Sequence, residues 1–235
     1  MLRHTSRSVL FVVLAASGCH TLPEAEPPLA CTLVLLKTGT RDEPLTAAEN
    51  KQVFGGHFAN MQRLAREGHL LLAGPYGKEK TDASLRGLFV LDTAERERAK
   101  ALAETDPGFQ AGVFAFEFHA LETTAPLRAF LAAELAAQDE AERAGRKLQP
   151  GEGGRMYTLL TADDADAAAA ALAGNPAVLL FARLDGKRAF AVLDAKDLEQ
   201  ARAVVAPVAA RLGSHVLDAW FASGGLANLP DKKRA

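Results

Sequence analysis

The chain has 235 residues, of which 49% are hydrophobic and 24% are charged. Its formal net charge is -2, and its lysines and arginines are spread along the chain rather than gathered in a basic stripe, which argues against a nucleic-acid partner. Two cysteines are too few for a disulfide framework, and the six histidines are scattered without Cys/His metal spacing, so we expect no metal site.

The first 19 residues have the layout of a bacterial signal peptide with a lipobox-like end. A short positive region precedes an apolar run over residues 9–16, which is too short to span a bilayer. Small residues then lead to Cys19, although Ala16 stands where a lipobox usually has leucine. We therefore expect a lipid on Cys19 that anchors the protein in the bacterial cell envelope, at a membrane facing the periplasm. The alternative is an ordinary cleaved signal and a secreted protein.

Residues 20–30 contain three prolines and two glutamates and are predicted to form a disordered tether. Cys31 follows and opens the first predicted strand, over residues 32–37. There we expect it to be a buried, unreactive, small hydrophobic side chain, because a disulfide to Cys19 would compete with lipidation.

Residues 31–125 are predicted to form one ferredoxin-like domain. The spacing of Thr46 and Glu49 predicts a capping box at the start of a helix that ends at Gly68. Asp92 and Glu95 are predicted to cap a second helix. The predicted strands are residues 32–37, 69–73, 85–91 and 113–121. The resulting order is β-α-β-β-α-β, which predicts an α+β fold of the split βαβ kind.

Residues 126–154 are predicted to be a linker, with a helix over residues 127–147 and a glycine-rich break after it. The same element order then recurs over residues 155–224, ahead of a C-terminal tail of residues 225–235. Arg86 and Arg188 open two segments in which 7 of 17 aligned residues are identical at an offset of 102. This match indicates an internal duplication.

The first half resembles the YciI-like (YCII-related) family of the dimeric α/β barrel group. The resemblance depends on His57, on Gly68, on the pair Gly74-Pro75 and on the pair Asp106-Pro107. It implies that His57 and Asp106 form an acid/base pair and that the ligand is a small molecule, since some relatives act on small chlorinated aromatic intermediates. It also implies two units that form one pseudo-dimeric α/β barrel, so the mature protein is expected to be a monomer.

The residues themselves support this pairing. His57 lies one to four positions from the apolar Phe54, Phe58 and Met61, so it belongs on or beside the buried helix face, where its nitrogens need partners. A carboxylate from Asp106 would fix the imidazole tautomer for general acid/base work. The alternatives are a core histidine with structural hydrogen bonds and, because Asp-Pro-Gly is a good turn, an Asp106 that only shapes a loop.

Two glycines, Gly55 and Gly56, precede His57 inside the helix, where each costs about 1 kcal/mol relative to alanine. We therefore expect a strand or a ligand to approach this backbone closely. Gly74, Pro75 and Tyr76 follow the second predicted strand and are predicted to line the same ligand pocket, with a packing role as the alternative.

The second half is predicted to lack the site. Alignment of the helix ends places Asp163 at the position of His57, and the offset of 102 places Val208 at the position of Asp106. His215 lies in the last predicted strand and is not a substitute. We therefore expect any pocket with converging polar groups to belong mainly to the first half.

The sequence contains no dinucleotide-binding, P-loop, nucleophile-elbow or zincin motif, so we expect no cofactor. Three hypotheses remain open. The chain is a small-molecule enzyme that uses His57 and Asp106, a binding or sensing module without chemistry, or a structural or interaction protein. A separation of the two side chains well beyond the hydrogen-bond reach of about 3 Å would favour the last.

Overall fold

The computed structural model describes residues 27–146 and 151–229. The predicted signal peptide with Cys19, and most of the predicted tether, lie outside the described residues. The first half contains β1 (Leu29–Thr38), α1 (Ala47–Arg66), β2 (Leu70–Pro75), β3 (Leu85–Leu91), α2 (Arg96–Ala103), α3 (Pro107–Gln110) and β4 (Phe114–Thr123), followed by α4 (Leu127–Arg143). The second half contains β5 (Gly154–Ala162), α5 (Ala165–Leu172), β6 (Val178–Leu184), β7 (Arg188–Leu193), α6 (Leu198–Val205), η1 (Ala206–Val208), α7 (Ala209–Leu212), β8 (His215–Ser223) and η2 (Gly224–Asn228).

Both halves have the predicted β-α-β-β-α-β order, so the expected α+β fold with two ferredoxin-like units is confirmed. The internal repeat is visible in the element bounds. Helix α6 occupies the residues that lie 102 positions after α2, and α7 occupies those 102 positions after α3. The agreement extends to side chains, because Thr32 donates to the carbonyl of Thr93 and Thr158 donates to the carbonyl of Ala195, which lies 102 positions after Thr93.

The eight strands form one antiparallel sheet in the order β2-β3-β1-β4-β6-β7-β5-β8. The two halves meet where β4 pairs with β6, from Leu121 opposite Leu184 to Thr123 opposite Ala182. The outer strands β2 and β8 approach each other through an antiparallel bridge between Tyr76 and Trp220. The sheet is therefore a nearly closed barrel, and the last strand of each half contacts the second strand of the other.

The inside of the barrel is filled with apolar side chains from both halves. Leu33, Leu88, Leu159 and Phe190 belong to this core, and Trp220 is fully buried in it. Separate apolar clusters lie under the helices of each half. The barrel interior is therefore a packed core that joins the halves.

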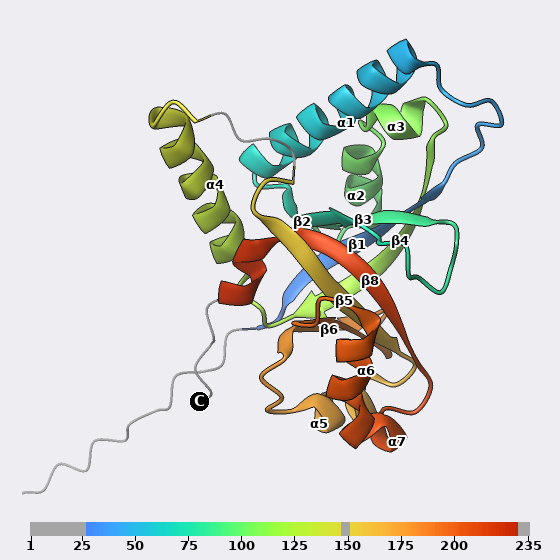
Figure 1. The fold of residues 1–235 in the computed structure, drawn as a ribbon, viewed down its shortest axis with the longest axis vertical. Coiled ribbons are helices and arrows are strands. Elements are labelled where there is room, and N and C mark those ends of the chain that lie inside the picture. The colour runs from blue at the N-terminus through green and yellow to red at the C-terminus, as the bar shows by residue number, and fades with distance from the viewer. Residues whose placement is uncertain (1–26, 147–150, 230–235) are drawn as a thin grey trace, which may run out of the picture.

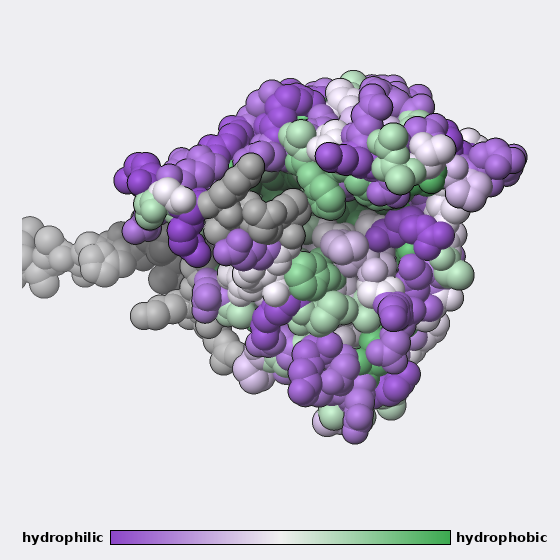
Figure 2. Space-filling model, turned by 45° about the horizontal axis from the view of Figure 1, so that its top comes forward, coloured by the Kyte–Doolittle hydropathy of each residue, from purple (hydrophilic) through white to green (hydrophobic). Residues whose placement is uncertain are grey.

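Figure 1 shows α1, α2 and α3 on one side of the barrel and α5, α6 and α7 on the opposite side, with α4 standing apart from both groups. Polar residues cover most of the surface seen in Figure 2, and apolar surface is concentrated in the hollow below α1. The polar outer surface is the one expected for amphipathic helices that cover a sheet.

Several boundaries differ from the prediction. Strand β1 begins at Leu29, inside the predicted tether, because Leu29 and Ala30 pair with the end of β4. The predicted linker helix ends at Arg143 rather than at residue 147. The predicted tail begins within η2, where Leu226 is fully buried and belongs to the barrel core. Cys31 is buried as expected, and burial raises the pKa of its thiol to about 12.

The predicted cap of the second helix is wrong. Asp92 forms a bidentate ion pair with Arg128 of α4, and no side chain caps α2. In the second half, Asp197 does cap α6, through the amide of Gln200. After α6 the helical path is interrupted near Pro207, because proline has no N–H for the helical hydrogen-bond ladder.

Candidate functional site

Helix α1 holds the candidate histidine in a fixed position. Thr46 and Glu49 form the predicted capping box, in which the Glu49 amide donates to Thr46 Oγ1 and the Thr46 amide donates to Glu49 Oε2. From this start the helix runs for 20 residues to Arg66. His57 lies at its middle, on the buried face and only 8% exposed.

Asp106 approaches His57 from the loop between α2 and α3. Its Oδ2 lies 2.6 Å from Nδ1 of His57, and its side chain is fully buried. Its Oδ1 accepts a hydrogen bond of 2.7 Å from the amide of Gly108 and thereby caps α3. One carboxylate oxygen therefore shapes the turn while the other lies against the imidazole.

Aromatic rings surround the imidazole. The ring centroids of Phe54, Phe58, Phe89 and Phe114 lie between 5.3 and 6.3 Å from that of His57. Phe58 is itself 45% exposed, so one side of this shell reaches solvent. The low-polarity surroundings strengthen the Asp106–His57 hydrogen bond. Within the described residues, Nε2 of His57 has no hydrogen-bond partner.

A close approach is found at Gly56 and not at Gly55, and the neighbour is the start of α3 rather than the expected strand or ligand. A Cβ atom at Gly56 would lie 2.9 Å from Cγ of Pro107, the residue after Asp106. A Cβ atom at Gly55 would meet nothing within 4 Å. The absence of a side chain at Gly56 therefore lets the start of α3 come close enough for Asp106 to reach His57. Nothing in the structure explains Gly55.

A second contact between α1 and the Asp106 loop was not predicted. Asn60 lies one helical turn after His57, and its Oδ1 accepts from Arg63 and lies 3.2 Å from Oγ1 of Thr105. Thr105 directly precedes Asp106 and also contacts Arg63. Oγ1 of Thr105 is also 2.7 Å from the carbonyl of Leu102, a shorter contact than the one to Asn60, and Arg63 donates to both Asn60 and Thr105. No local sequence motif predicts this contact, because Asn60 and Thr105 are 45 residues apart in the chain.

The second half has the framework without the pair. Asp164 caps α5, which has only 8 residues, so Asp163 lies ahead of the helix rather than within it. Val208 directly precedes α7, just as Asp106 directly precedes α3, and has no carboxylate to offer. His215 begins β8, and its Nδ1 is 2.8 Å from the carbonyl of Gly213. The second half therefore offers no such pair at the positions that match His57 and Asp106.

The structure places Gly74, Pro75 and Tyr76 at the junction with β8 rather than beside His57. The Gly74 carbonyl accepts a hydrogen bond of 3.0 Å from Trp220 Nε1, and a Cβ atom at Gly74 would collide with the Phe221 carbonyl. Tyr76 forms the bridge with Trp220, and burial raises the pKa of its hydroxyl well above the usual range. These residues therefore have the packing role that was the alternative. Their contacts are with β8, so the prediction that they line a pocket together with His57 is not supported.

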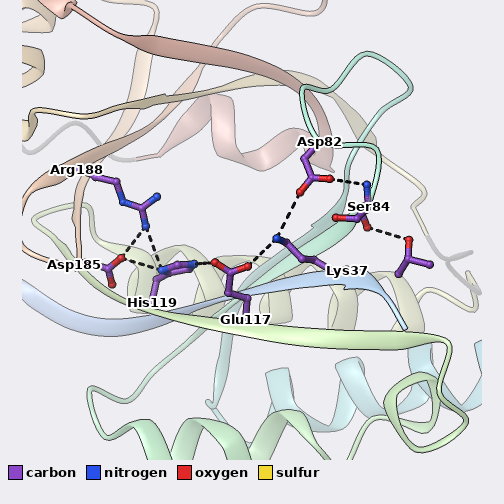
Figure 3. Close-up of polar contacts among 8 residues, drawn as sticks. Lys37, Asp82, Ser84, Glu117, His119, Asp185 and Arg188 are labelled. Carbon is purple, nitrogen blue, oxygen red and sulfur yellow. Dashed lines mark hydrogen bonds and ion pairs between the residues drawn. The ribbon is translucent and has the colours of Figure 1, made fainter. Parts of the chain in front are cut away.

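A second histidine lies in a chain of charged groups that links the halves (Figure 3). His119 Nδ1 is 2.9 Å from Asp185 of the second half, and its Nε2 is 2.9 Å from Glu117. Arg188 extends the chain beyond Asp185, and Lys37 extends it beyond Glu117 to Asp82. Because a carboxylate faces each ring nitrogen, His119 has no free nitrogen for proton transfer and serves to join the two halves.

Among the described residues, no group of three or more His, Cys, Asp or Glu side chains is arranged to hold a metal ion. No helix in that part of the chain is both long enough and apolar enough to cross a membrane.

Together, the fold and the buried His–Asp pair define an α+β barrel protein with one candidate acid/base site in its first half. Among protein families, the model of the YCII-related domain matches residues 34–117. The first half of this chain is therefore a YCII-related domain. Comparison with curated proteins and with solved structures found no match.

Proposed function

We propose that the YCII-related domain is a small-molecule enzyme in which His57 and Asp106 act as an acid/base pair. The 2.6 Å contact between Nδ1 of His57 and Oδ2 of Asp106, buried in an aromatic shell, carries this proposal. The carboxylate accepts a hydrogen bond from Nδ1–H, which favours the neutral tautomer whose lone pair is on Nε2. Nε2 is the nitrogen without a partner among the described residues, so it is the atom that exchanges a proton with substrate.

Reactivity of that nitrogen tests the proposal before any substrate is known. Diethyl pyrocarbonate acylates the free nitrogen of a neutral imidazole, and peptide mass spectrometry identifies the modified histidine. We expect His57 to be acylated in the wild type and its rate to fall in Asp106→Asn, where the ring is no longer oriented. Asp163→Asn, the matched change in the second half, is the control and should leave the rate unchanged. A His57 rate that is indifferent to Asp106→Asn would reject the acid/base role.

A test of turnover separates catalysis from binding without chemistry. The protein is incubated with a panel of small lactones, esters and oxo acids in D₂O, and solvent deuterium incorporation or hydrolysis is followed by NMR. We expect activity on a member of this panel that is lost in His57→Ala. Binding of panel members that persists without any turnover would favour the ligand-binding or sensing alternative. An absence of both would favour the structural alternative.

We also propose that the domain is held in the bacterial cell envelope by a lipid on Cys19. The charged start, the short apolar run and the small residues before Cys19 support this placement. Mass spectrometry of the protein from a bacterial membrane fraction should find acyl chains on Cys19, and Cys19→Ala should release the protein from that fraction. Recovery of the wild type in the cytoplasm with Met1 intact would contradict the proposal.

We further propose that the mature protein is a monomer, because the second half already occupies the place that a second copy would take beside the first. The β4–β6 pairing and the Tyr76–Trp220 bridge support this view. Sedimentation at micromolar concentration should give the mass of one chain, and a stable dimer would contradict it.

A further inference from the structure

An open surface pocket of about 370 Å³ lies in the first half, at the start of α1, and its lining does not include the His57–Asp106 pair. Its lining comes mainly from the loop between β1 and α1, with Asn50, Arg86 and Val113 completing it. The volume lies within the usual range for small-molecule sites, which is roughly 300 to 1,000 Å³. His57 and Asp106 are not part of the lining, so this cavity is a separate feature of the YCII-related domain.

The loop that builds the cavity has no counterpart in the second half. Eight residues, 39–46, connect β1 to α1, whereas only Asp163 and Asp164 connect β5 to α5. Backbone hydrogen bonds hold the loop in place, from Gly39 to the carbonyl of Val113 and from Arg41 to the carbonyl of Gly112. The cavity wall is therefore preformed, which lowers the entropy cost of binding.

The charged residues of the lining are two arginines and one carboxylate, Glu43, and one of the arginines has no carboxylate partner. Arg41 is held by Glu49 Oε1 at 3.1 Å and by the carbonyl of Glu43 at 2.8 Å. Arg86 has one long hydrogen bond, 3.4 Å to the carbonyl of Ala83, and no ion pair with any described residue. Its repeat counterpart Arg188 is instead neutralised by Asp185 at 2.7 Å. Of these two equivalent arginines, Arg188 is held in an ion pair, whereas the guanidinium of Arg86 can bind an anion.

The rest of the lining suits a small organic anion. Arg86 presents a planar guanidinium fork that matches carboxylate and phosphate oxygens. Asn50 adds a side-chain amide, and Pro44, Leu45 and Val113 supply apolar wall. The charges of Arg41, Arg86 and Glu43 in the lining sum to one net positive charge, but Glu49, the partner of Arg41, brings the local sum to zero. Attraction for an anion therefore depends on the guanidinium of Arg86, which has no ion pair with any described residue. The site therefore fits one anionic group attached to an apolar body.

We propose that this cavity binds the carboxylate or phosphate group of a small organic molecule, with Arg86 as its main anion ligand and Asn50 as a second hydrogen-bond donor. The proposal goes beyond the acid/base function and does not depend on it. Binding here requires no proton transfer, and loss of His57 should leave it intact.

The test is an NMR titration of the full-length protein with labelled arginine side chains, using sodium butyrate, inorganic phosphate and neutral butyramide as probes. We expect saturable shifts of the Arg86 Nε signal with an anion and none with butyramide. The anion that binds more tightly identifies the preferred head group. Arg86→Gln should weaken binding by about tenfold or more, the usual effect of losing a charged hydrogen bond. Arg188→Gln, the matched variant in the repeat, should keep the affinity within about twofold.

A second variant, at Asn50, tests the same site independently of Arg86. Asn50→Asp places a negative charge in the lining without touching Arg86 or the barrel core, and it should also abolish binding of either anion. His57→Ala should bind the anion like the wild type, which separates this site from the acid/base proposal. The proposal is overturned if neither anion saturates, if butyramide shifts the same signals, or if Arg86→Gln and Arg188→Gln weaken binding equally.

Discussion

The two halves of the chain share their strands and second helices but differ at the first helix and at one residue before the short third helix. Helix α1 has 20 residues and α5 has 8, while α2 and α6 each have 8. Asp106 caps α3, and Val208 stands at the matching position before α7. The barrel needs both halves to close, so the fold is retained in each. The long helix, its glycines and the buried aspartate are not needed for closure, and only the first half has them.

The largest expected effect concerns the junction of β2 and β8, which depends on one residue of the second half. Trp220 is fully buried and donates to the Gly74 carbonyl, so Trp220→Ala should lower the free energy of unfolding by about 3 to 5 kcal/mol. Urea denaturation measures this change. Val216→Ala, in the same strand and 39% exposed, is the control and should change stability little. A Trp220→Ala variant as stable as the control would mean that the halves do not meet there.

The next effect distinguishes the two glycines of α1. Gly56→Ala forces a Cβ atom to 2.9 Å from Pro107, and overpacking of this kind costs about 1 to 3 kcal/mol. The better helix propensity of alanine offsets up to about 1 kcal/mol of that cost. Gly55→Ala meets nothing within 4 Å, so it should stabilise the protein by up to about 1 kcal/mol. Thermal and urea unfolding should therefore show lower stability for Gly56→Ala and higher stability for Gly55→Ala. A gain of stability in both variants would mean that the contact with Pro107 does not require glycine at position 56.

The smallest effect concerns the charged chain between the halves and its dependence on pH. The hydrogen bond from Lys37 holds the pKa of Glu117 below its usual 4.5. A lowered carboxyl pKa contributes stability above pH 4.5, and this contribution is lost as the pH falls through the lowered pKa. Glu117 is 45% exposed, so solvent screening limits the contribution to below about 1 kcal/mol.

Lys37→Met removes that hydrogen bond, so urea unfolding should show a small loss of stability at neutral pH that disappears in acid. Lys100→Met, which breaks an exposed contact of 3.9 Å within one helix, is the control and should show less dependence on pH. A Lys37→Met loss that persists at acid pH would arise from packing rather than from charge.

Local patterns predicted the local features of this molecule well. The capping box at Thr46, the element order and the offset of 102 are all encoded within short segments, and each is present in the structure. The His57–Asp106 contact spans 49 residues and was predicted only because a family resemblance named both residues. Gly56 gave an independent signal, since a glycine inside a helix is costly and implies a close neighbour.

Long-range contacts explain what the sequence could not reveal. Asp92 has a good capping position, but a bidentate ion pair with Arg128 of α4 takes its carboxylate. Gly74 and Tyr76 resemble loop residues beside a pocket, yet the barrel closes through them because β8 approaches from 144 residues away, the separation of Tyr76 and Trp220. No sequence motif marks His119, and its contact between the halves depends on Asp185, which is 66 residues later in the chain. Such pairings are decided by the packing of the two halves.

A buried carboxylate holds His57 in the first half, and the matching positions of the second half have no such pair. Nitrogen-15 NMR of the imidazole tests it directly, because the two ring nitrogens differ in shift according to which one carries the proton. In the neutral ring we expect the proton on Nδ1 and a bare Nε2 in the wild type and in Asp163→Asn. We expect loss of this single tautomer in Asp106→Asn. A neutral His57 with its proton on Nε2, or a tautomer that Asp106→Asn leaves unchanged, would contradict the account.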